Sequence, residues 1–117
     1  MYIYTMKPNI QLFKGSLNTI ILKLLKENDK MYGYEITKKV KELSSGNLQL
    51  TEGALYPALH KLEAEGQLTV TVEHIGNRNR KYYSLTKQGV KETNNKLQEV
   101  AEFIAQMQQI LNLKLAP

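Results

Sequence analysis

The 117-residue sequence predicts a mainly α fold with a small β-hairpin. Three observations lead to this fold class. Apolar residues recur at helical spacing in three segments before residue 66, and apolar and polar residues alternate between residues 67 and 85. A last segment, from residue 86 to about residue 113, carries apolar residues at a 3.5-residue period. A chain of this length suffices for one domain with a modest core.

The composition excludes several classes of protein and site. The chain has no Cys, so it has neither a disulfide framework nor a thiolate metal site. His60 and His74 stand alone and no glycine-rich phosphate loop is present, so we expect no enzyme activity and no cofactor. No apolar run approaches the roughly 18 residues of a membrane span, and the MYIYTMK start is too short for a signal peptide. A cytoplasmic protein is therefore expected.

The net charge of +5 is unevenly distributed. From Val90 to the end, three lysines and three glutamates cancel, so the whole excess lies in residues 1–89. A basic front half is typical of a protein that binds a polyanion. A charge of this size is also ordinary for a small soluble domain, so the balance by itself decides little.

The first two helices supply most of the expected core. Residues 1–10 show no clear period and form an unassigned N-terminal arm. A helix is expected from about Gln11 to Glu27, because its apolar residues form one broad stripe. A second helix is expected from about Tyr32 to Leu43, with Ile36, Val40 and Leu43 on its inner face. The SSGN loop ends this helix, and Leu48–Leu50 is compatible with a minor strand.

The third expected helix, Thr51 to Gly66, carries its own start and stop signals. Thr51 can cap the free N–H groups, and Gly66 suits a left-handed closing residue. Pro57 opposes the pattern, since spacing alone would end the helix at Tyr56. One face is apolar, through Leu55, Leu59 and Leu62. The opposite face is polar and suits contact with a partner, through Glu52, Gly53, Tyr56, His60 and Lys61.

A β-hairpin is expected after Gly66. Leu68, Val70 and Val72 alternate with polar residues, which predicts a half-buried strand over residues 67–74. Residues 75–79 form the turn and residues 80–85 the return strand, with Tyr83 and Leu85 inward and Tyr82 outward. The tip is basic, through Arg78, Arg80 and Lys81, and His74 flanks it.

This order of elements predicts a winged helix-turn-helix, in which the hairpin is the wing. We interpret the third helix as entering a groove of double-stranded DNA. The arginines of the wing would reach phosphates or a minor groove, and the lysines of the second helix would contact the DNA backbone. The candidate DNA-binding residues are Lys38, Lys39, Thr51, Gly53, Tyr56, His60, Lys61, Arg78, Arg80 and Lys81.

The last expected helix begins near Thr86, which can cap it, and runs to about Leu113. Gly89, early in this helix, is a weak point. A heptad seam runs along it, formed by Leu97, Val100, Ile104, Met107 and Leu111. A small domain offers too little surface to cover such a stripe, so the pattern favours a homodimer. The alternative is that this helix folds back onto its own domain.

Three segments of the chain resemble PadR-family transcriptional regulators: MYGYEI (31–36), LTEGALYPALHKLEAEG (50–66) and RKYYSLTKQG (80–89). The LYPAL run is a hallmark of the family and accounts for Pro57. The resemblance implies a winged-helix DNA-binding domain in residues 1–89 and a C-terminal dimerisation helix in residues 90–117. It further implies repression at a palindromic promoter site, relieved by a small molecule.

The single short C-terminal helix resembles the smaller subfamily, whose multidrug sensors stack flat drugs between tryptophans. This chain has no Trp. The candidate residues for a small apolar inducer are Val100, Phe103 and Met107, which suit seam packing equally well. Two other functions fit the same pattern: a winged-helix module that docks on an acidic protein, and a ligand-sensing dimer without operator specificity.

Overall fold

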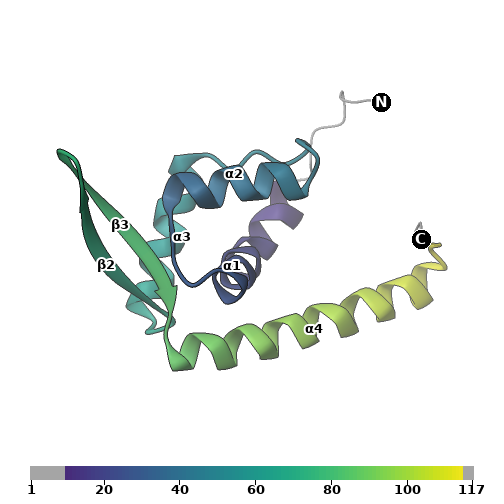
Figure 1. Ribbon diagram of the computed structural model, residues 1–117. Helices are drawn as coiled ribbons and strands as arrows, with labels where there is room; N and C mark the ends of the chain where they lie inside the picture. Colours follow the sequence, from purple (N-terminus) through teal and green to yellow (C-terminus); the bar gives the residue numbers. More distant parts are fainter. Residues whose placement is uncertain (1–9, 115–117) are drawn as a thin grey trace.

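The computed structural model describes residues 10–114 and has the predicted mainly α fold. The N-terminal arm lies outside the described residues, apart from Ile10. The elements follow in the order α1 (Ile10–Glu27), β1 (Met31–Tyr32), α2 (Gly33–Leu43), α3 (Glu52–Ala64), β2 (Leu68–Ile75), β3 (Arg78–Leu85) and α4 (Lys87–Leu111). In Figure 1, α1, α2 and α3 form a compact group, the hairpin projects on one side, and α4 extends away on the other.

The core lies between α1, α2, α3 and the base of the sheet. Leu55, Leu59 and Leu62 are all buried, which confirms the predicted apolar face of α3. From β3, Tyr83 points inward and is 1% exposed, and burial raises the pKa of its phenol. Leu43 is different: it was expected on the inner face of α2 but is 68% exposed, because α2 ends there, beyond the core.

The third strand of the sheet is not where the sequence placed a minor strand. The antiparallel order is β1-β3-β2, and β1 is formed by Met31–Tyr32. Leu48–Leu50 is irregular instead. Leu50 is apolar because it inserts into the core just before α3. The Leu48 N–H does not pair with a strand and donates to the Ser44 hydroxyl at 2.9 Å.

The wing is longer and its turn tighter than expected. Every residue from Leu68 to Ile75 pairs with one on β3, so the turn contains only Gly76 and Asn77. Gly76 has φ +61°, a value that favours glycine. Val72 is 50% exposed, although its alternation predicted an inward side chain, because the hairpin has left the domain body by that residue.

Both predicted capping threonines act as N-caps. The Thr51 hydroxyl accepts from Ala54 N–H at 3.2 Å, and the Thr86 hydroxyl accepts from Gly89 N–H at 3.0 Å. Helix α3 continues through Pro57. The carbonyl that Pro57 leaves unbonded belongs to Gly53, in the exposed first turn where water can reach it.

Helix α4 packs on α1 through its first half. Lys26 donates to the Asn94 side chain at 2.7 Å, and Thr93 is fully buried. Farther along, α4 extends beyond the other elements (Figure 1). Within residues 10–114, no helix combines the length and apolar character needed to span a membrane.

Candidate nucleic-acid interface

The outer face of α3 is exposed and polar. Because three leucines anchor its inner face, Gly53, Tyr56 and His60 face outward, and Thr51 is exposed at its start. The Tyr56 and His60 rings lie side by side, with centroids 6.3 Å apart. The start of this helix therefore exposes hydrogen-bonding side chains, and Gly53 allows its backbone to come close to a partner. A helix that reads a DNA groove has these features.

Gly33, at the start of α2, determines where Tyr56 lies. A Cβ atom added at Gly33 would lie 2.5 Å from the Tyr56 hydroxyl oxygen and 2.9 Å from the ring carbon that bears it. The Tyr56 ring therefore crosses the start of α2 with no room for a side chain. Sequence reasoning did not select Gly33, because its spacing carries no sign of this tertiary contact.

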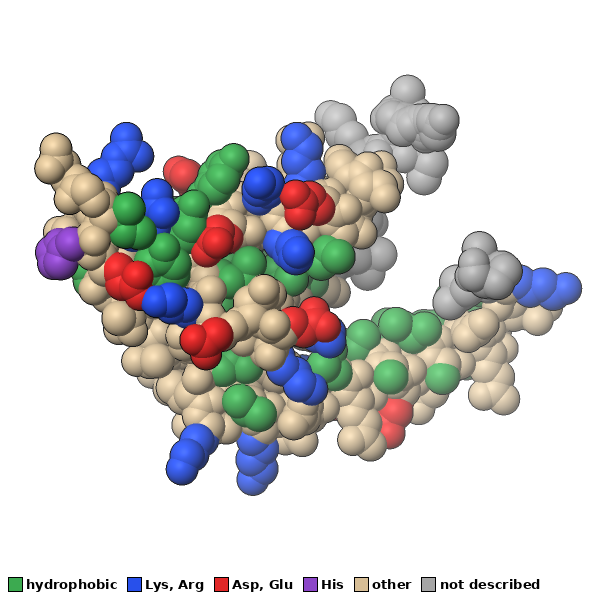
Figure 2. Space-filling view, in the orientation of Figure 1, with side chains coloured by type: hydrophobic (Ala, Val, Ile, Leu, Met, Phe, Trp, Pro, Cys, Tyr) green, Lys and Arg blue, Asp and Glu red, His purple; other side chains and the backbone are tan. Residues whose placement is uncertain are grey.

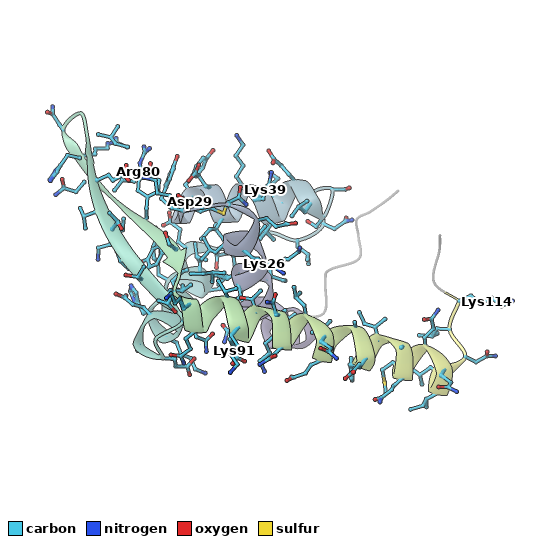
Figure 3. The ribbon with its side chains drawn as sticks, turned by 60° about the horizontal axis from the view of Figure 1, so that its bottom comes forward. Lys26, Asp29, Lys39, Arg80, Lys91 and Lys114 are labelled. Carbon is cyan, nitrogen blue, oxygen red and sulfur yellow. The ribbon has the colours of Figure 1, made fainter. Side chains whose placement is uncertain are left out.

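A surface groove of about 650 Å³ runs between α2 and the loop that leads into α3. Lys38 lies in this groove, together with Tyr34 and Lys41, which are not among the ten candidate residues. Lys39 does not line this groove; it lines a second hollow, beside Asn28, to which Lys38 also contributes. Figure 3 shows Lys39 extending from α2 on the side away from α4. The groove and the start of α3 thus form one surface with two cationic side chains.

Lys61 lies apart from the other outward residues of α3. Lys61 lines a cavity of about 320 Å³, together with Asn18 of α1 and Glu92 of α4. The candidate residues of α3 therefore divide into two groups. Thr51, Gly53, Tyr56 and His60 lie along one surface, and Lys61 faces α1 and α4.

The wing residues also occupy different environments. Arg78 and Lys81 are exposed, whereas Arg80 is half-buried. Figure 3 shows Arg80 between the wing and α2. Its guanidinium carbon lies 4.2 Å from the centroid of the Tyr32 ring. A hydrogen bond with the Tyr82 side chain is the main reason why the pKa of Arg80 lies above its ordinary value.

A second cation links the wing to the body of the domain. Lys30 forms an ion pair with Glu73 of β2, and its ammonium nitrogen lies 4.8 Å from the centroid of the Tyr82 ring. The hydrogen bond to Glu73 is the main cause that raises the pKa of Lys30. This cation was not among the sequence candidates, since nothing in its neighbours along the chain points to Glu73.

Helix α4 exposes a long apolar stripe. Val100 is 37% exposed, Ile104 46% and Leu111 57%, while Leu97 and Met107 are half-buried. Phe103 and Ile110 widen this stripe and are also exposed. Figure 2 shows hydrophobic side chains along the projecting helix. Large exposed apolar patches are typical of surfaces that bind another molecule.

The stripe continues into an apolar groove of about 510 Å³ between α1, the end of α2 and the first half of α4. Its apolar lining is formed by Ile20, Leu24, Val40, Leu43, Leu48, Leu97 and Val100. This apolar groove accounts for Leu43, whose exposed side chain lies at its edge. Across residues 10–114, no group of three or more His, Asp or Glu side chains is arranged to hold a metal ion.

Comparison with known proteins points to one family. The model of the transcriptional regulator PadR-like family matches residues 21–95. The transcriptional regulator YqjI of Escherichia coli is 35% identical over 75 residues, which cover 64% of this chain and 34% of YqjI. The chain thus corresponds to about a third of that relative.

Solved structures of similar proteins share the fold. A transcriptional regulator from Clostridium thermocellum is 28% identical and superimposes with a TM-score of 0.80, over 87% of this chain and 96% of that one. Bacillus subtilis PadR, solved in complex with operator DNA, is 33% identical with a TM-score of 0.63, over 69% of this chain and 45% of that one.

Proposed function

This chain belongs to the PadR-like family of transcriptional regulators, and we propose that it represses transcription as a homodimer bound to an inverted-repeat promoter site. In this proposal residues 1–89 bind double-stranded DNA and residues 90–117 form the dimer. The observation that carries it is the single surface formed by the outer face of α3 and the groove along α2. The operator complex of Bacillus subtilis PadR supports the same use of the fold.

On this surface each element has a distinct task. The first turns of α3, with Gly53, Tyr56 and His60, approach the base edges of a major groove. Lys38 and Lys41 bind phosphates on one side of that groove. On the other side, Arg78 and Lys81 of the wing reach the phosphates or the minor groove.

The exposed stripe of α4 supports the dimer. Five seam positions follow the heptad period, and α4 projects too far for its own domain to cover them. A second copy supplies a matching stripe, and the pair buries both. A two-fold dimer presents its two α3 helices to successive major grooves, about 34–36 Å apart, which requires an inverted repeat in the operator.

Relief of repression by a small apolar ligand is a further part of the proposal. The apolar groove supports it, because Val100 lines a volume of about 510 Å³. Phe103 and Met107 lie farther along α4 and do not line this groove, so in the proposed dimer they would meet a ligand at the subunit contact. Titration with small apolar compounds tests this part, since a ligand that binds the folded protein raises its melting temperature.

Selection of binding sites from random duplex DNA tests the proposal as a whole. We expect the purified protein to enrich an inverted repeat whose half-sites lie about one helical turn apart. Enrichment of a single half-site would contradict the dimer. Salt-sensitive binding without enrichment would contradict operator recognition, and would favour a module that docks on an acidic protein or a ligand-sensing dimer.

Replacing Gly53 by alanine should change stability and DNA binding in opposite directions. A Cβ atom there would meet only the Thr51 hydroxyl, at 3.9 Å, so the methyl group fits. Alanine should stabilise this exposed turn by about 0.5–1 kcal/mol, measured by thermal unfolding. The same methyl group should weaken operator binding by about tenfold, because it occupies the space in which the helix approaches the bases.

Gly15→Ala provides the control, because it also adds a methyl group at an open helical position, on α1. It should raise stability without affecting the operator. Undiminished DNA affinity in the Gly53→Ala variant would remove the start of α3 from the interface.

Replacing Arg78 and Lys81 together by alanine should flatten the dependence of operator affinity on salt. Each phosphate contact that is lost lowers the slope of log K against log salt by about 0.9, so the double variant should lose up to about 2. The control is Lys91→Ala with Lys114→Ala, which removes two charges at positions that Figure 3 shows on and beyond α4, away from the wing. An equal loss of slope in both double variants would mean that net charge, and not wing contact, governs binding.

A further inference from the structure

The wing is joined to the domain at the point where its sheet narrows. β1 pairs only with Tyr82 and Tyr83, so beyond Tyr82 the strands β2 and β3 continue as a two-stranded ribbon. Two-stranded ribbons are weakly held by their own hydrogen bonds. Glu73 and Arg80 are direct cross-strand partners on this ribbon, and side-chain alternation places Arg80 on the same face as Tyr82.

Glu73 and Arg80 both contact side chains in the segment around β1. The Arg80 guanidinium stacks on the Tyr32 ring at 4.2 Å, and the Tyr32 ring meets the edge of the Tyr82 ring, with centroids 5.5 Å apart. Glu73 binds Lys30, whose ammonium group lies over Tyr82. Five side chains thus form what we term the wing strap: Lys30, Tyr32, Glu73, Arg80 and Tyr82.

The wing strap ends on the helix-turn-helix. Tyr32 is the residue that precedes α2, and its N–H donates to the Glu35 carboxylate at 3.1 Å. Gly33, the next residue, touches Tyr56 of α3. The stack between Arg80 and Tyr32 therefore connects the ribbon to the start of α2, which contacts Tyr56 of α3.

We propose that Arg80 is a positioning residue that sets the angle of the wing relative to α3, and that it does not contact DNA phosphates. This inference rests on the proposed DNA binding. Arg80 is a partly buried residue whose guanidinium stacks on an aromatic ring, whereas Arg78 and Lys81 on the same strand are exposed. Arginine stacks well on aromatic rings through its planar guanidinium, and such contacts orient a side chain.

Three variants of the full chain test the role of Arg80: Arg80→Ala, Tyr32→Leu and Tyr32→Phe. The first two remove the stack from either side, and the third keeps the ring. The first measurement is amide hydrogen exchange of the ribbon, residues 72–75 and 78–81, in the free protein. We expect exchange there to be about fivefold faster in Arg80→Ala and Tyr32→Leu, with α1 and α3 unchanged and Tyr32→Phe like the wild type.

The second measurement is operator affinity as a function of salt. We expect Arg80→Ala and Tyr32→Leu each to weaken operator binding about fivefold and to keep the wild-type dependence on salt. Because both changes remove the same contact, the variant that combines them should bind no more weakly than either single variant. A slope reduced by about 0.9 in Arg80→Ala, with unchanged exchange, would overturn the proposal and make Arg80 a phosphate contact. If the wild type binds no operator, the proposed DNA binding fails, and hydrogen exchange alone tests the wing strap. Unchanged exchange of the ribbon in Arg80→Ala and Tyr32→Leu would then overturn the role of Arg80, whereas faster exchange would support it.

Discussion

Replacing Ile104 and Met107 together by glutamate is expected to yield monomers whose operator affinity is lower by at least about a hundredfold. Both side chains lie in the middle of the α4 stripe, and Ile104 is 46% exposed in the single chain. A partner would bury both positions, where unpaired carboxylates are costly to bury and repel one another across a two-fold axis. Light scattering measures the mass, and titration with the selected operator measures the affinity.

The control for this variant places the same charges on the opposite face of α4. Gln98 and Gln109 lie about half a turn from the seam, so Gln98→Glu with Gln109→Glu should remain dimeric and bind DNA normally. A seam variant that keeps its dimer mass would place the subunit contact elsewhere. Monomers that still bind the full operator tightly would mean that each half-site is read independently.

The fold could be predicted because its helices combine clear apolar periods with specific caps. Thr51 and Thr86 both act as the N-caps that the sequence suggested. Leu43 and Val72 could not be placed in this way, although each continues a correct period. A period shows which side chains share a face, but whether that face is covered depends on where neighbouring elements end. α2 ends at Leu43, and the domain body ends before Val72.

The candidate interface was predictable to the level of helix faces and not of individual contacts. The polar face of α3 follows from spacing, and Tyr56 and His60 do lie side by side on it. Lys39 and Arg80, by contrast, have neighbours that are distant in the sequence. Lys38 and Lys39 are adjacent in the chain, yet only Lys38 lines the groove that leads to α3, so composition could not separate them.

The junction of α3, β2 and α4 shows why the two proposed functions are mechanically connected. The Thr86 hydroxyl donates to the Gly66 carbonyl at 2.6 Å, and the Thr86 N–H donates to the Gln67 carbonyl at 3.0 Å. Thr86 is also the N-cap of α4, and Gly66 closes α3 with φ +81°. The helix that we assign to dimerisation therefore starts on the turn that ends the proposed recognition helix, with a single residue between β3 and α4.

Replacing Gly89 by alanine should destabilise the protein by about 2–3 kcal/mol, or about 10 °C in melting temperature. In most helices this change is stabilising, and the sequence suggested only a weak point at Gly89. Here an added Cβ atom would overlap the Gln67 carbonyl oxygen and lie 3.3 Å from a Leu85 methyl carbon.

The Gln67 carbonyl cannot move aside from alanine at Gly89, because it accepts the Thr86 N–H at the junction. Thermal unfolding at one fixed protein concentration measures the loss, with Gly53→Ala as the matched change in an open turn. If Gly89→Ala melted at or above the wild-type temperature, the close approach of α4 to the start of β2 would be wrong. If it melted lower yet bound the operator normally once folded, the junction would support stability alone and would not fix the angle between α3 and α4.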